Sequence, residues 1–270
     1  MKFVCTAFII FVLSLASGAT ENRFSGARSL ALSHATVALG GSEALFHNQA
    51  AIGFSNRISL AMAYESRFAM KEYALMSLGA VIPFKPVVVG LSFYQFGNSV
   101  YRENKTGLVL ARNFGEKFSM GLQFDFFSEK IPENREAFTA VTVELGFLYK
   151  LNEKITGGIH IFNPVKSALH TPVGKIELPV NVRIGGIWHI KSDLFLVAEI
   201  EKQKSRPLKL KAGVEYSPLN SVSFRLGISD GPFMPSGGVG FHFGKFLFDI
   251  GTAYYQYLGF SPSASFVFVL

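Results

Sequence analysis

The chain has 270 residues, including 28 Phe, 26 Gly and a single cysteine, Cys5. Its 14% aromatic content excludes a disordered chain, and one cysteine excludes an internal disulfide framework. The net charge is +7, but no run of five basic residues exists, so the charge predicts no nucleic-acid partner.

The first nineteen residues have the pattern of an export signal. A positive start at Lys2 is followed by an apolar run from Phe3 to Leu15 and by small residues up to Ala19. We therefore predict a signal peptide over residues 1–19, removed after about Ala19. The apolar run is shorter than a membrane helix requires, and no later segment is long enough for a helical span.

From Arg57 onward, apolar and polar residues alternate, which predicts strands with one apolar and one polar face. About fourteen such runs are present. They cover residues 57–64, 73–83, 87–96, 106–113, 117–128, 138–150, 154–162, 179–189, 193–201, 207–216, 221–229, 236–243, 246–255 and 262–270. Most have roughly 8–13 residues, the length that a tilted strand needs to cross a bilayer.

The connections between these runs alternate in length. Tight turns are predicted at 84–86, 114–116, 151–153, 191–192, 217–220 and 244–245. Longer polar stretches fall between them, at 65–72, 97–105, 129–137, 163–178, 202–206, 230–235 and 256–261. Short turns at one end and long loops at the other are typical of an outer-membrane barrel, with both termini on the periplasmic side.

Each run that enters a tight turn ends on an outward-facing aromatic residue. These residues are Phe84, Phe114, Tyr149, Trp188, Tyr216 and Phe243. Aromatic rings favour the membrane–water interface, so we predict a periplasmic aromatic belt.

The opposite face of the runs carries charges of both signs, which we assign to a polar lumen. The predicted lumen residues include Asp125, Glu144, Arg183, Glu199, Lys209, Lys211, Arg225 and Asp249. Glu199 and Glu201 end one run while Lys209 and Lys211 begin the next, so a hairpin would pair them across the ladder.

Residues 24–54 break the alternating pattern and are rich in small residues. This segment contains Gly26-Ala27-Arg28, then Gly40-Gly41, then Phe46 followed by Asn48-Gln49-Ala50. The pattern resembles the N-terminal segment of the FadL-like outer-membrane barrels, most closely their PorV/PorQ branch, which is typical of Bacteroidota. Gln49 stands where that family usually has Pro, so the local turn is expected to differ.

The resemblance implies an all-β fold: a transmembrane antiparallel β-barrel of about fourteen strands whose N-terminal segment plugs the lumen. We accordingly predict a signal peptide at 1–19, a plug at 20–56 and a barrel at 57–270, in the bacterial outer membrane. Arg28, Phe46 and Asn48 are the expected plug residues, and Arg28 is expected to pair with a lumen acid such as Glu144 or Asp249.

Two functions follow from the resemblance. The PorV/PorQ branch serves type IX secretion, which implies an accessory or attachment role with secretion-machinery or exported proteins as partners. The FadL branch passes hydrophobic molecules such as fatty acids. The lack of large extracellular lids favours the protein-handling role. Outer-membrane lipid is the expected partner of the apolar face in either case.

Signals for catalysis are weak. Gly227-Ile-Ser229-Asp-Gly231 matches the Gly-x-Ser-x-Gly pattern of serine hydrolases. In those enzymes a helix follows the nucleophile, and no helix is predicted after Ser229. His160, His189 and His242 lie on separate runs and predict no metal site. We expect no enzyme, catalytic residue, metal or cofactor. The alternatives from other classes are a soluble periplasmic all-β lipid carrier, with its apolar faces meeting inside, and a hydrolase built on Ser229.

Overall fold

The computed structural model describes residues 22–131, 137–171 and 174–270. The predicted signal peptide lies outside these residues. Three short helical segments come first: α2 (Ala27–Ala31), η2 (Ser42–Phe46) and η3 (Gln49–Phe54). No helix in the described part of the chain is long and apolar enough to cross a membrane.

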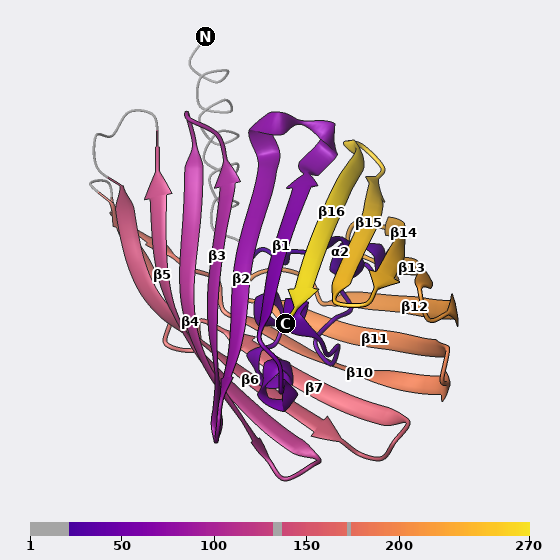
Figure 1. The fold of residues 1–270 in the computed structure, drawn as a ribbon. Helices are drawn as coiled ribbons and strands as arrows, with labels where there is room; N and C mark the ends of the chain where they lie inside the picture. Colours follow the sequence, from indigo (N-terminus) through magenta and orange to yellow (C-terminus); the bar gives the residue numbers. More distant parts are fainter. Residues whose placement is uncertain (1–21, 132–136, 172–173) are drawn as a thin grey trace.

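Fourteen of the strands in the described residues form one closed antiparallel barrel (Figure 1). They are β1 (Ser59–Ser66), β2 (Ala74–Phe84), β3 (Val87–Gly97), β4 (Arg102–Phe114), β5 (Phe118–Lys130), β6 (Phe138–Lys150), β7 (Ile155–Phe162), β10 (Asn181–Lys191), β11 (Leu194–Gln203), β12 (Lys209–Leu219), β13 (Val222–Ser229), β14 (Met234–Phe243), β15 (Phe246–Tyr255) and β16 (Gly259–Val269). β1 pairs with both β2 and β16, which closes the ring and leaves no free sheet edge. The predicted strand number is confirmed.

The two ends of the barrel differ as the connection lengths predict. Tight turns join β2 to β3, β4 to β5, β6 to β7, β10 to β11, β12 to β13 and β14 to β15. The other connections meet at the opposite end, and β1 begins and β16 ends at the tight-turn end. We call these the short-turn end and the long-loop end, and assign them to the periplasm and the outside.

Two features of the long-loop end differ from expectation. The stretch 65–72 contains two single turns of helix, η4 (Arg67–Ala69) and η5 (Lys71–Tyr73). The predicted loop 163–178 contains a small hairpin, β8 (Ala168–Thr171) paired with β9 (Gly174–Glu177). Leu169 of β8 is buried with Phe162 and Phe127, which explains why this loop folds onto the lumen.

The apolar face of the strands points outward and the polar face lines the lumen. Leu226, Leu78 and Ile184 are more than half exposed on the outer surface, whereas Glu144, Arg183 and Glu199 are almost fully buried inside. In a soluble lipid carrier the apolar faces would meet in an interior. In this barrel they do not, because they point outward. A surface this apolar needs lipid as its surroundings.

The predicted belt residues lie at the short-turn end with their side chains exposed. Phe84, Phe114, Tyr149, Trp188, Tyr216 and Phe243 have exposed fractions of 58%, 50%, 47%, 51%, 45% and 62%. Their role at the membrane interface stays a prediction.

Most of the N-terminal segment from residue 22 to Phe54 lies inside the ring of strands (Figure 1), and we call this segment the plug. α2 packs on β14 and β15, whereas η3 packs on β4, β5 and β6. Leu32, Leu45 and Ile52 of the plug join wall residues such as Val109 and Val197 in one buried apolar cluster.

Glycines in the barrel wall let the plug backbone approach closely. A Cβ at Gly146 would lie 2.2 Å from Asn48 Oδ1, and a Cβ at Gly121 would lie 2.5 Å from the Gln49 backbone. Other wall glycines in close contact with the plug are Gly79, Gly90, Gly158, Gly227, Gly238 and Gly251. The plug thus packs on the part of the inner wall where glycines take the inward-facing positions.

Candidate functional site

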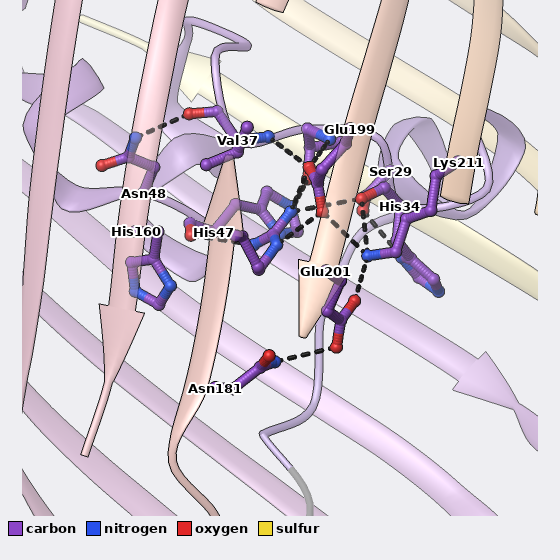
Figure 2. Close-up of polar contacts among 12 residues, drawn as sticks. Ser29, His34, Val37, His47, Asn48, His160, Asn181, Glu199, Glu201 and Lys211 are labelled. Atoms are coloured by element: carbon purple, nitrogen blue, oxygen red, sulfur yellow. Dashed lines mark hydrogen bonds and ion pairs between the residues drawn. The ribbon is translucent and has the colours of Figure 1, made fainter. Parts of the chain in front are cut away.

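The plug is tied to the barrel wall by buried polar contacts from separate strands. The most connected is Glu199 of β11, which is 2% exposed. Its carboxylate accepts the backbone N–H groups of Thr36 and Val37 at 2.9 and 2.8 Å. Figure 2 shows Val37 and Lys211 converging on this carboxylate.

Arg183 of β10 completes this cluster. Its Nε and Nη2 donate to Glu199 at 2.7 and 2.8 Å, and its guanidinium also donates to the backbone carbonyls of His34 and His47. Lys211 lies 2.9 Å from Glu199 and also pairs with Glu201. We call Arg183, Glu199 and Lys211 the anchor. Because its members bond both to one another and to the plug backbone, the anchor fixes the middle of the plug.

A second contact holds the region around α2. Arg28 Nε and Nη2 donate to Glu215 of β12 at 2.9 and 3.0 Å. Arg28 thus pairs with a lumen acid, as expected, but the acid is Glu215 and not Glu144 or Asp249, the two examples named from the sequence. Asp249 instead accepts from Arg225, which also binds Glu215. Arg28 reaches Glu215 because α2 lies on the β13–β16 side of the lumen, away from Glu144.

A third contact holds the end of the plug. Gln49 Nε2 donates to Glu144 at 2.8 Å and to Gln123 at 3.0 Å. Glu144 also binds Lys105 at 2.6 Å and His160 at 2.8 Å. Gln49, which stands where the family usually has Pro, thus donates hydrogen bonds from its side-chain amide to the barrel wall. A proline side chain has no donor for such bonds.

Asn48 caps η3, because its Oδ1 accepts the N–H of Ala50 at 3.1 Å. Its Nδ2 donates to the carbonyl of Val37 at 2.6 Å and more weakly to wall carbonyls. Phe46 is partly buried against the plug's apolar cluster. Asp125 is buried beside Gln123 Nε2, 4.0 Å from Lys105.

Near its start, the plug has a further contact that the sequence did not reveal. Arg23 donates twice to Glu103 of β4, at 3.0 and 2.8 Å, and its guanidinium lies 3.5 Å from the centre of the Phe96 ring. A single arginine outside any motif gives no sequence signal for such a partner.

The plug separates two pockets. The inner pocket, about 400 Å³, opens toward the short-turn end beside Arg28, Glu43, Glu215 and Asp249. Burial, reinforced by Asp249, raises the pKa of the Glu43 carboxyl to about 7. Burial and the charge of Arg183 lower the pKa of His47 to about 3, so this plug histidine is neutral.

The outer pocket, about 290 Å³, lies at the long-loop end between the plug and β11–β15. Phe24, Phe68, Met234 and Tyr255 form its apolar wall. Arg67, Arg206, Lys209 and Lys211 also line it, against one carboxylate, Glu201. Lys209 lies opposite Glu201 in the ladder and Lys211 lies opposite Glu199, which is the register that the hairpin predicts. The outer pocket is therefore amphipathic, with a positive excess.

Beside the outer pocket, the lumen at the long-loop end is filled by an apolar cluster. Tyr94, Phe96, Phe127 and Phe162 of the wall pack there against Leu169 of the β8–β9 hairpin. This cluster gives the β2–β7 side of the lumen an apolar filling at the long-loop end.

The residues considered for other chemistry do not converge. Ser229 Oγ is buried and has no hydrogen-bond partner among the described residues. His160 binds Glu144, whereas His242 Nε2 donates to the Gly244 carbonyl. In the described part of the chain, no group of three metal-ligating side chains is assembled.

No protein-family model and no curated protein sequence matches the chain. Solved structures do match. The monoaromatic hydrocarbon channel CymD has a TM-score of 0.69 at 15% identity, over 91% of this chain and 97% of that one. The toluene transporter TodX of P. putida has a TM-score of 0.68 at 12% identity, over 93% and 99%.

A FadL homologue from Pseudomonas aeruginosa has a TM-score of 0.63 at 12% identity, over 93% of this chain and 98% of that one. At these identities the likeness shows the fold: a closed fourteen-stranded barrel of the FadL type. The neighbours are transport channels, and none of them bears on the PorV/PorQ branch.

Proposed function

We propose that this protein admits small hydrophobic molecules to the outer membrane, with the outer pocket as the binding site. The observation that carries the proposal is an amphipathic pocket at the long-loop end of a FadL-type barrel, directly against the plug. The similar structures are a toluene transporter and a monoaromatic hydrocarbon channel, which supports a hydrophobic cargo. The protein-export role suggested by the N-terminal motif has no support from these comparisons.

The charge of the outer pocket favours molecules with an anionic group. A long-chain carboxylate would lay its hydrocarbon on Phe24, Phe68 and Met234 and its carboxylate toward Lys209 and Lys211. Desolvated ion pairs of this kind discriminate strongly between charged and uncharged ligands. We therefore expect fatty acids to bind more tightly than hydrocarbons of the same length.

Lys211 connects the pocket to the plug, because it lines the pocket and also binds Glu199 of the anchor. A ligand carboxylate at Lys211 competes with Glu199 for the same ammonium. Binding in the outer pocket is thereby coupled to the strength of the anchor.

The test is equilibrium binding of oleate and of heptadecane, the matched hydrocarbon without a carboxylate, to the detergent-solubilised barrel. Saturable oleate binding that is at least tenfold tighter than heptadecane binding is expected. Lys209→Ala is expected to weaken oleate binding, and Met234→Trp to block both ligands by filling the pocket. Lys204→Ala is the matched control, because Lys204 pairs with Glu177 on the exposed surface outside the pocket. Absence of saturable binding by either ligand overturns the proposal.

A further inference from the structure

The outer face of the barrel has an asymmetric charge distribution. Every carboxylate that the described barrel strands carry lies in the lumen phase of the ladder, as Glu103, Glu129 and Glu144 illustrate. Charged residues in the outward phase at the long-loop end are basic, and Arg102 and Lys130 are neighbours there. Within the barrel strands, the outward phase at the long-loop end thus carries cations and no carboxylate.

Arg102 of β4 and Lys130 of β5 are direct cross-strand partners. Like charges in this position repel, unless an anion lies between them. Neither residue forms an ion pair with a described carboxylate. Their chain neighbours Glu103 and Glu129 point into the lumen, where both bind Tyr101. Arg102 makes only a long hydrogen bond of 3.4 Å to the Asn98 carbonyl.

Next to this basic pair, a row of uncharged polar side chains crosses the outward face. Gln95, Asn104, Ser128 and Thr139 are consecutive lateral partners on β3, β4, β5 and β6. Asn104 Oδ1 is buried without a hydrogen-bond partner among the described residues. This row, which we call the polar row, interrupts the apolar surface across four neighbouring strands.

Below the polar row, the outward face is hollowed. Two adjoining apolar hollows of about 410 and 420 Å³ lie over β15, β16 and β1–β4, and both are lined by Met62, Leu78 and Phe93. They form because small outward residues, Ala264 in one and Ala80 in the other, stand between large ones. Thr106, one outward position from Asn104, lines the second hollow, about 7 Å along β4 from the polar row. The first hollow reaches Tyr64 and Met76, and Met76 is the lateral partner of Gln95.

We propose that this face binds a phosphorylated glycolipid of the outer leaflet, of the lipid A type. Arg102 and Lys130 hold its phosphate, the polar row faces its sugar and amide groups, and the hollows take acyl chains. The order of cation, neutral polar group and hydrocarbon along β4 matches the order of groups in such a lipid. Arginine is suited to the phosphate because its planar donors bind two oxygens at once. The proposal rests on the outer-membrane location and not on the cargo.

The test compares binding of diphosphorylated lipid A, the same lipid after phosphate removal, and phosphatidylglycerol to the detergent-solubilised full chain by native mass spectrometry. We expect diphosphorylated lipid A to bind at least tenfold more tightly than either of the others. Arg102→Gln with Lys130→Gln is expected to abolish that preference.

Arg112→Gln is the matched control, because Arg112 occupies the same phase of the same strand at the short-turn end and should retain full binding. Ala80→Phe fills one hollow and is expected to weaken all three lipids without changing the preference for phosphate. Heat-dependent gel mobility reports folding of each variant, and Arg102→Gln alone replaces the double variant where that does not fold.

Three results overturn the proposal: equal binding of lipid A with and without phosphate, equal binding of phosphatidylglycerol, or a loss in Arg112→Gln as large as in the double variant. Oleate binding measured on the same preparations separates this test from that of the proposed function. The double variant should bind oleate normally.

Discussion

Removal of the Glu199 carboxylate tests whether the anchor holds the plug in place. In Glu199→Ala, Arg183 loses two charge-assisted hydrogen bonds, and the N–H groups of Thr36 and Val37 lose their acceptor. Breaking a buried ion pair by removing one partner costs about 3–5 kcal/mol. That corresponds to a rise of about 10² to 4 × 10³ in the population of barrels with a detached plug.

The assay is ion conductance in planar bilayers together with thermal melting in detergent. Wild-type protein should be closed, because the plug fills the middle of the lumen, whereas Glu199→Ala should show frequent openings and an earlier loss of plug structure. Glu177→Ala is the matched control, since Glu177 forms an exposed pair with Lys204 and exposed pairs contribute about 0–1 kcal/mol. Wild-type conductance and melting in Glu199→Ala would refute the assignment of the anchor.

Two further outcomes are expected. Gly146→Ala places a Cβ 2.2 Å from Asn48 Oδ1 and should destabilise the bound plug by about 1–3 kcal/mol in thermal melting. Gly157→Ala on the next strand is the control and should leave the melting unchanged, because its Cβ would lie 3.9 Å from the nearest atom. Equal effects of the two substitutions would contradict the close packing of the plug on the wall. Because burial raises the pKa of Glu43 to about 7, above its usual 4.5, folding favours the protonated form. The stability contributed by this shift is present below about pH 4.5 and is lost as the pH rises through 7. The wild-type protein should therefore have a lower melting temperature at pH 8 than at pH 5, and Glu43→Gln should reduce that difference. An unchanged difference in Glu43→Gln would mean that other groups cause it.

The barrel was predictable because its strands repeat one simple physical pattern. Alternation places Phe124 and Leu226 outward and Glu144 and Arg225 inward, and a closed ring is the arrangement that pairs every strand edge in lipid. The ladder between Glu199 and Lys211 followed from the hairpin alone. These are local patterns, which the sequence displays directly.

The partners of the plug were not predictable in the same way. Arg28 binds Glu215 across 187 positions of sequence, and Arg23 binds Glu103 across 80. The plug has no regular period, so its path through the lumen cannot be predicted from the sequence. Several lumen acids are therefore equally plausible partners for each arginine. Gln49 could be seen as a departure from the family pattern, but its bonds to the wall become visible only in the folded chain.

The polar interior of the barrel is compatible with the hydrophobic cargo that we propose, because its charged groups hold the plug. The anchor and the Arg28–Glu215 contact hold the plug against the wall at the middle of the lumen. The apolar surfaces lie elsewhere: in the aromatic cluster around Phe127 and the outer pocket at the long-loop end, and in the hollows of the lipid-facing side. Under the proposed function, a hydrophobic molecule loses favourable contacts where it meets the anchor and the Arg28–Glu215 contact in the middle of the lumen. Under that proposal, such molecules bind in the outer pocket at the long-loop end, and the plug, held by these polar contacts, is the barrier to water and ions in the lumen.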